Sequence, residues 1–212
     1  MTLDEALAHF RAIVGAVDLP VNADFEGGFA VEPAAVGANV FRATGTGIAG
    51  ISIEDSTGDA LQPLFDFDLS VARVRAARAA IDASGADVVL TGRSEGFIVG
   101  RPDLEETIRR LRAYASAGAD CLYAPGLRSR SAISAVVAAV APWPVNVLIG
   151  AEGAGVAELS AMGVRRISVG GGLARAAWGG FLEAAREIAE RGTFTSLARA
   201  VPFADIDGAF AR

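Results

Sequence analysis

Two acidic side chains follow an apolar segment near the start of the chain, within the sequence VNADFEGGF at residues 21–29. Asp24 and Glu26 stand two positions apart, and residues at that spacing in an extended strand lie on one face. Neighbouring carboxylates repel each other unless they share a cation. Gly27 and Gly28 follow, and because glycine has no side chain they would let the backbone approach a ligand closely. The segment therefore indicates one edge of a binding site.

Three later apolar segments also carry polar side chains at or near their ends. These side chains are Glu54 and Asp55, then Arg93 and Glu95, then Asn146. In α/β folds the carboxyl ends of parallel strands build the binding site. We therefore expect these side chains to converge with the acidic pair at one end of a sheet.

Carboxylates gathered in one place favour a hard cation, and Mg²⁺ prefers few direct carboxylates together with waters and substrate oxygens. We predict Asp24 as a direct ligand of Mg²⁺ or Mn²⁺, with Glu26 and Glu54 bound directly or through water. Arg93 is predicted to bind a substrate carboxylate, because its planar guanidinium matches the two carboxylate oxygens. Arg93 and the nearby Glu95 are the two candidate catalytic residues.

Simpler roles remain open for some of these residues. Asp55 can equally be a helix cap or a loop residue, and Glu95 can form a purely structural ion pair with Arg93. The glycine-rich segment at residues 168–177 can be a phosphate-binding loop before a helix or a tight turn. The candidate substrate contacts are Arg93, Asn146, Gly27 and Gly28.

Composition excludes several kinds of chemistry. All 19 basic residues are arginine, so Schiff-base chemistry, pyridoxal phosphate attachment and the P-loop lysine are excluded. The single histidine, His9, is predicted to be non-catalytic and the single cysteine, Cys121, to lie in the core. Disulfide frameworks and Cys/His zinc clusters within one chain are therefore excluded. A net charge of −6 disfavours nucleic acid as a partner.

The apolar segment at residues 132–151 is long enough to cross a membrane. Pro142, Pro144 and Asn146 interrupt it, so a helix followed by a strand is the better interpretation. The charged opening sequence lacks the apolar core of a signal peptide. We expect a cytoplasmic protein that has no membrane partner.

The order of apolar patterns predicts one α/β domain over residues 1–212. Strands are expected at 19–24, 49–55, 87–95, 120–125, 144–150 and 165–171. Helices are expected at 3–17, 33–43, 68–83, 103–117, 129–140, 153–162 and beyond 174. The expected strands are apolar on both faces, as in a parallel sheet covered by helices. A closed (β/α)8 barrel needs eight strands. Six strands therefore imply either an open sheet of another kind or a barrel with two strands missing.

Four segments resemble the isocitrate lyase/phosphoenolpyruvate mutase family. They are PVNADFEGGF (20–29), AGISIEDS (49–56), LTGRSEGF (90–97) and YASAGADCLYAPG (114–126). The resemblance implies a TIM-type (β/α)8 barrel that uses magnesium to act on 2-oxo or 2-hydroxy carboxylates through enolate-like intermediates. Asp24, Glu26 and Glu54 then fall on metal-site carboxylates, and Arg93 falls on the substrate-binding arginine.

The chain also departs from that family. The first two strands of the barrel are missing, which we interpret as an N-terminal truncation. The loop STGDALQPLFDFD (56–68) lacks the cysteine of isocitrate and methylisocitrate lyases and the gating-loop asparagine of the mutase. We therefore expect a magnesium-dependent lyase or decarboxylase acting on a small carboxylic acid, or alternatively a non-catalytic relative. The family implies a homo-oligomer, either a tetramer or a dimer. The helices at about 174–212 are then either exchanged between subunits or packed on the barrel of their own chain.

Overall fold

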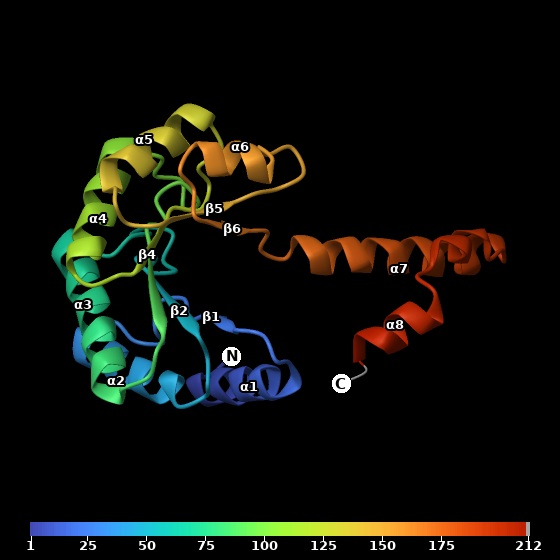
Figure 1. Ribbon diagram of the computed structural model, residues 1–212, viewed down its shortest axis with the longest axis horizontal. Helices are drawn as coiled ribbons and strands as arrows, with labels where there is room; N and C mark the ends of the chain where they lie inside the picture. The colour runs from blue at the N-terminus through green and yellow to red at the C-terminus, as the bar shows by residue number, and fades with distance from the viewer. Residues whose placement is uncertain (211–212) are drawn as a thin grey trace. The chain divides into compact units, whose positions relative to one another are not determined.

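The computed structural model describes residues 1–210. The chain divides into two compact units, Met1–Ser168 and Val169–Arg212. The first unit carries the strands and the second consists of helices (Figure 1). The expectation that residues 1–212 form a single domain stays a prediction.

The first unit is built on a sheet of six parallel strands in the order β1-β2-β3-β4-β5-β6. Each strand pairs with the next one in the sequence, and the sheet curves into a half-barrel (Figure 1). Every strand is shorter than the predicted range, because the flanking residues leave the sheet and enter loops. The strands are β1 (Asn22–Asp24), β2 (Gly50–Glu54), β3 (Val89–Arg93), β4 (Cys121–Tyr123), β5 (Val145–Leu148) and β6 (Arg166–Ser168).

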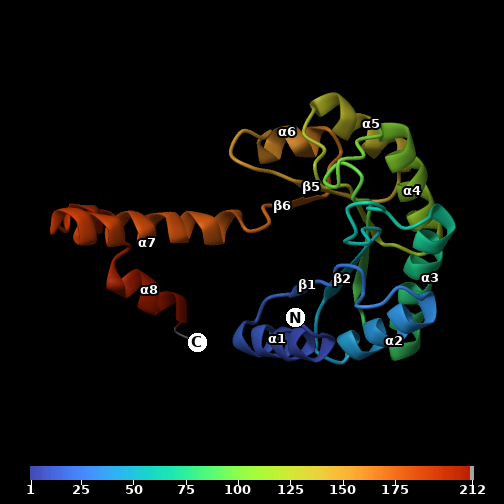
Figure 2. The ribbon, with the colours of Figure 1, turned by 180° about the vertical axis from the view of Figure 1, so that it is seen from behind.

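Helices alternate with the strands, and α2 to α5 cover the outer side of the curved sheet (Figures 1 and 2). The predicted capping box is present, since Thr2 and Glu5 bond each other's backbone at the start of the first helix. Gly85 ends α3 in the left-handed conformation at φ 69°. The helices are α1 (Leu3–Ala16), α2 (Pro33–Thr44), α3 (Phe67–Ser84), α4 (Leu104–Ser116), α5 (Arg130–Val140) and α6 (Val156–Ala161).

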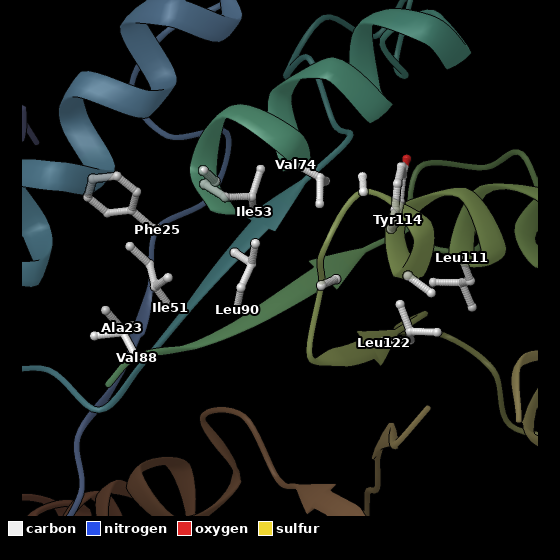
Figure 3. Packing of buried hydrophobic residues seen from close by; sticks show 14 of the residues in the cluster. Ala23, Phe25, Ile51, Ile53, Val74, Val88, Leu90, Leu111, Tyr114 and Leu122 are labelled. Atoms are coloured by element: carbon white, nitrogen blue, oxygen red, sulfur yellow. The ribbon is translucent and has the colours of Figure 1, made fainter. Parts of the chain in front are cut away.

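The hydrophobic core lies between the sheet and its covering helices. Ile51 and Ile53 of β2 and Leu90 of β3 point toward the helices, where Val74 and Tyr114 meet them (Figure 3). The expectation that the strands are apolar on both faces is wrong. Alternate residues on the other face are polar, because that face lines the inside of the half-barrel. They include Ser52, Thr91, Asn146 and Arg166.

The second unit contains α7 (Gly172–Arg191), the short 3-10 helix η1 (Thr195–Arg199) and α8 (Phe203–Phe210). Large apolar side chains of this unit are exposed, and Trp178 packs edge-on against Phe181 with ring centres 5.3 Å apart. Within residues 1–210 no helix is both long and apolar enough to cross a membrane. The apolar segment at 132–151 forms most of α5 followed by β5, as predicted.

Candidate active site

Strand register places four side chains at one level of the sheet, three of them predicted site residues and the fourth Tyr123. Glu54 pairs with Arg93, Arg93 with Tyr123, and Tyr123 with Asn146 across neighbouring strands. Residues that pair in register lie on the same face, so these four, here called the polar row, line the inside of the half-barrel. Asp24 lies beside them at the end of β1, where it pairs with Ser52.

Arg93 is the centre of this site. Its Nη1 donates to Asp24 Oδ1 at 2.9 Å, and its Nε donates to Glu95 Oε1 at 2.9 Å. Its Nη2 lies 3.1 Å from Glu54 Oε2. The guanidinium also lies 5.2 Å from the centre of the Tyr123 ring, within cation–π range. One arginine therefore contacts three carboxylates that come from β1, β2 and the segment after β3.

Burial controls the ionisation of these groups. It raises the pKa of Glu54 from 4.5 to about 7, against the opposing effect of Arg93. Burial likewise raises the pKa of Glu95, although Arg93 again acts in the opposite direction. Burial also disfavours the charge on Arg93, but the carboxylates of Glu95 and Glu54 outweigh it and raise the pKa of Arg93. Glu54 is therefore the carboxyl group of the site that can gain or lose a proton near neutral pH.

Glu26 lies on the turn that follows β1. It is exposed and adopts a left-handed backbone conformation at φ 47°, which is uncommon for a residue with a side chain. Its backbone oxygen accepts a hydrogen bond from Glu54 N at 3.1 Å. This bond joins the turn that carries Asp24 and Glu26 to the end of β2, so the three predicted metal ligands belong to one connected piece of backbone.

The three carboxylates fit Mg²⁺ by chemistry, since they provide the hard oxygen donors that this ion prefers. In the described part of the chain, however, no three His, Cys, Asp or Glu side chains are placed to hold an ion together. Asp24 and Glu54 contact Arg93 instead. Their assignment as metal ligands, together with Glu26, stays a prediction.

Both glycines of the turn are close to other parts of the protein. A Cβ on Gly28 would lie 2.9 Å from Val36 Cγ1, and one on Gly27 would lie 3.2 Å from Arg73 Nη2. Protein packing therefore restricts these positions to small residues. Their predicted contact with a substrate is untested.

Asp55 is not a helix cap; it lies in the loop directly after β2, and its side chain is buried. It is 1% exposed and accepts hydrogen bonds from Glu95 N at 2.7 Å, Arg110 Nη1 at 3.1 Å and Tyr114 Oη at 2.6 Å. The carboxylate thus holds the backbone of Glu95 in place next to Arg93. The helix-cap interpretation of Asp55 is wrong, and its structural role was not predicted because its partners on α4 are far away in the sequence.

Asn146 is buried at the β5 end of the polar row. Its Nδ2 donates to Ser168 Oγ at 3.0 Å, while its buried Oδ1 has no hydrogen-bond partner within the described residues. A buried acceptor without a partner is unfavourable. Asn146 Oδ1 is therefore available to a donor group on a ligand.

A cavity of about 620 Å³ lies between the loops that follow β2 and β3. Leu64, Ser94, Gly96, Arg101 and Arg110 are among the residues that line it. None of the predicted site residues does. The cavity lies next to the backbone that flanks Glu95 and has no direct part in the arrangement around Arg93.

Sequence reasoning missed the side chains that hold the site from behind, namely Arg73, Arg110, Tyr114 and Tyr123. A signal was available for two of them. Arg73 and Arg110 occupy the buried faces of α3 and α4, where an apolar residue is expected. An arginine at such a position indicates a specific polar partner.

A profile of the phosphoenolpyruvate phosphomutase family matches residues 1–189. The chain belongs to this family. A solved relative described as a 2,3-dimethylmalate lyase of the PEP mutase/isocitrate lyase superfamily has 27% identity and a TM-score of 0.84, covering 99% of this chain and 74% of its own. The predicted family is therefore confirmed.

Another family structure, a candidate lyase/mutase from Burkholderia cenocepacia J2315, has 47% identity and a TM-score of 0.95. The match covers 100% of this chain and 77% of that one. The six strands therefore form part of a TIM barrel of the phosphoenolpyruvate phosphomutase family, which confirms the predicted fold.

Curated family members have named activities. An oxaloacetate decarboxylase of Bradyrhizobium diazoefficiens is 31% identical over 144 residues, which is 66% of this chain and 48% of that protein. This chain thus spans about half the length of the curated relatives with which it is compared. The relatives with named activities include enzymes that act on small carboxylates.

Proposed function

We propose that this chain forms a magnesium-dependent lyase that cleaves a carbon–carbon or phosphorus–carbon bond in a small 2-oxo or 2-hydroxy carboxylic acid. The observation that carries the proposal is the position of Arg93 among Asp24, Glu54 and Glu95. It combines a group that binds carboxylates with oxygen donors suited to a hard cation. A family structure described as a phosphonopyruvate hydrolase complex with oxalate and Mg²⁺ supports this pairing of ligands, at 26% identity and a TM-score of 0.83.

Each side chain has a task in this proposal. The guanidinium of Arg93 would bind the substrate carboxylate once Asp24 and Glu54 turn from Arg93 to the cation. Asp24 would hold the cation directly, with Glu26 and Glu54 bound directly or through water, and the cation would supply positive charge where negative charge develops on the substrate. Glu95 orients Arg93 through its Nε contact and, with its raised pKa, is suited to carry a proton.

Asn146 contributes a hydrogen-bond acceptor in this scheme. A substrate hydroxyl would satisfy its buried Oδ1. The class of substrate agrees with the relatives described as oxaloacetate decarboxylase and 2,3-dimethylmalate lyase. The products of such a cleavage would be smaller carboxylic acids.

One observation favours a second possibility, a non-catalytic family member. Arg93 already forms ion pairs with Asp24 and Glu54, so the site contains a positive charge without a bound cation. A protein in which this ion pairing is permanent would keep the scaffold and lose the reaction. The two possibilities differ in whether the chain binds Mg²⁺ together with a carboxylate ligand.

Thermal unfolding with Mg²⁺, with oxalate and with both tests the proposal. A ligand that binds only the folded state raises the unfolding midpoint. We expect a rise that needs both ligands and disappears in Asp24→Asn. The matched control is Asp87→Asn, an exposed carboxylate close to the opposite end of β3, which should keep the rise. A folded wild-type chain without any rise would favour the non-catalytic alternative.

The family also supports a homo-oligomer as a proposal for this chain. The second unit exposes large apolar side chains, including Trp178 and Phe181 at 61% and 60%. Exposed apolar surface of this kind is typical of protein interfaces. We therefore assign α7 to contacts between copies of this chain.

A further inference from the structure

Arg73 is a completely buried arginine on α3 that forms no ion pair within residues 1–210. Its guanidinium donates only to backbone oxygens. Nη1 donates to Ala30 O and Val31 O, each at 2.6 Å, and Nη2 donates to Gly27 O. The guanidinium also lies over the ring of Phe65, 4.1 Å from its centre. One side chain thus holds three carbonyls of the loop that joins β1 to α2.

Burying a charge without an ion-pair partner is unfavourable, and burial lowers the pKa of Arg73, although the carboxylates of Asp55 and Glu54 oppose this effect in part. Its Nε has no hydrogen-bond partner among residues 1–210. An apolar side chain of similar length would fill the same space without that penalty. The physical effect that compensates for the penalty is the set of bonds to the loop at residues 27–31.

That loop needs external support. Glu26 and Phe29 adopt left-handed backbone conformations, at φ 47° and 56°. Residues with side chains keep such conformations only where the surroundings hold them. Asn39 Nδ2 supports the middle of the loop by donating to Gly28 O at 2.9 Å. Arg73 is the side chain that bonds to carbonyls on both sides of Gly28.

Arg73 contacts both loops that directly follow the predicted metal ligands. The loop at residues 27–31 begins immediately after Glu26, and Phe65 belongs to the loop that follows Glu54. We propose that Arg73 is a positioning residue that fixes the turn after β1 and thereby aims Asp24 and Glu26 at the cation. This inference rests on the proposed function, because that function assigns Asp24 and Glu26 to the cation.

Two variants test this role against a matched control. Arg73→Met removes all three carbonyl contacts and keeps the apolar length of the side chain. Arg73→Lys keeps the charge, but a single nitrogen cannot hold the three carbonyls as the planar guanidinium does. Arg75→Met is the control, because Arg75 lies two positions further along the same helix and is exposed.

Calorimetry measures the binding of Mg²⁺ in the presence of oxalate for each folded variant. Loss of a group that orients metal ligands typically lowers metal affinity by roughly 10–100-fold. We expect a loss in that range for Arg73→Met, a smaller loss for Arg73→Lys and no change for Arg75→Met. Unchanged affinity in both Arg73 variants would overturn the proposal. If Arg73→Met does not fold, Arg73→Lys decides alone.

Amide hydrogen exchange at residues 25–31 of the ligand-free protein provides a readout that does not depend on the reaction. Faster exchange in Arg73→Met and Arg73→Lys, but not in Arg75→Met, is expected if Arg73 holds the loop. Unchanged exchange would refute that role. A wild-type chain that binds neither Mg²⁺ nor oxalate would overturn the proposed function, and with it the role of Arg73 in orienting Asp24 and Glu26. Hydrogen exchange would still decide whether Arg73 fixes the backbone of the loop.

Discussion

The hydroxyl group of Tyr114 offers a sharp test of the network behind Arg93. Tyr114 is fully buried, and its Oη donates to Asp55 Oδ2 at 2.6 Å. Burial raises the pKa of Tyr114 well above its usual value, so the hydroxyl keeps its proton and can donate. Figure 3 shows its aromatic ring among the core residues and its oxygen at the far end of the ring. Tyr114→Phe removes this oxygen and leaves the ring packing intact.

The structure sets the size of the effect. A hydrogen bond to a charged group contributes about 1.5–3 kcal/mol. Asp55 Oδ2 also accepts from Arg110 Nη1 at 3.1 Å, so Tyr114→Phe does not leave it without a partner. We therefore expect a loss of about 2 kcal/mol in the free energy of unfolding, toward the lower end of that range. For a chain of this size the melting temperature should fall by roughly 4–8 °C.

Urea denaturation followed by circular dichroism measures this loss, and the slope of the free energy against urea should not change. Asp55→Asn and the double variant complete a thermodynamic cycle. Asp55→Asn should cost more, about 3–5 kcal/mol, because it leaves the buried Arg110 without its charged partner on that side. The double variant should then be less destabilised than the sum of the single variants. A loss below about 0.5 kcal/mol for Tyr114→Phe, or strict additivity, would refute the reasoning.

Two further predictions concern the second unit. Hydrogen bonds from Thr193 and Thr195 lower the pKa of Glu187 to about 2. Since the unfolded value is about 4.3, the stability that Glu187 contributes should be present above that pH and lost as the pH falls toward 2. Circular dichroism should detect this loss in the wild type, and a Glu187→Gln variant with the same pH dependence would contradict it. Sedimentation should find an oligomer that a double Trp178→Ser, Phe181→Ser variant weakens, whereas a wild-type monomer at high concentration would rule out the proposed interface.

Much of the fold follows from short-range patterns in the sequence. The capping box at Thr2, the proline at the start of α2 and the left-handed Gly85 each depend only on neighbouring residues. The alternation of helices and strands predicts a parallel sheet, because such units close most simply in sequence order. Strand ends were less accurate, since the length of a strand depends on how far its neighbour pairs with it.

The sequence also indicated which residues gather at the site, because the carboxyl ends of parallel strands meet at one edge. It indicated the ion pair between Arg93 and Glu95 but none of the other pairings. Arg93 contacts Asp24, which is 69 positions away in the sequence, and Asp55 contacts Tyr114, 59 positions away. Contacts over such distances depend on strand register and helix packing, which no local pattern encodes.

The sequence by itself thus determined the family, the order of the elements and the polar character of the strand ends. Only the tertiary structure decided that Arg93 joins three carboxylates, that Asp55 holds Glu95, and that Arg73 supports the turn after β1. The physical reason is that local conformation depends on residues a few positions apart. The partner of a buried charge, in contrast, is selected by the packing of the whole unit.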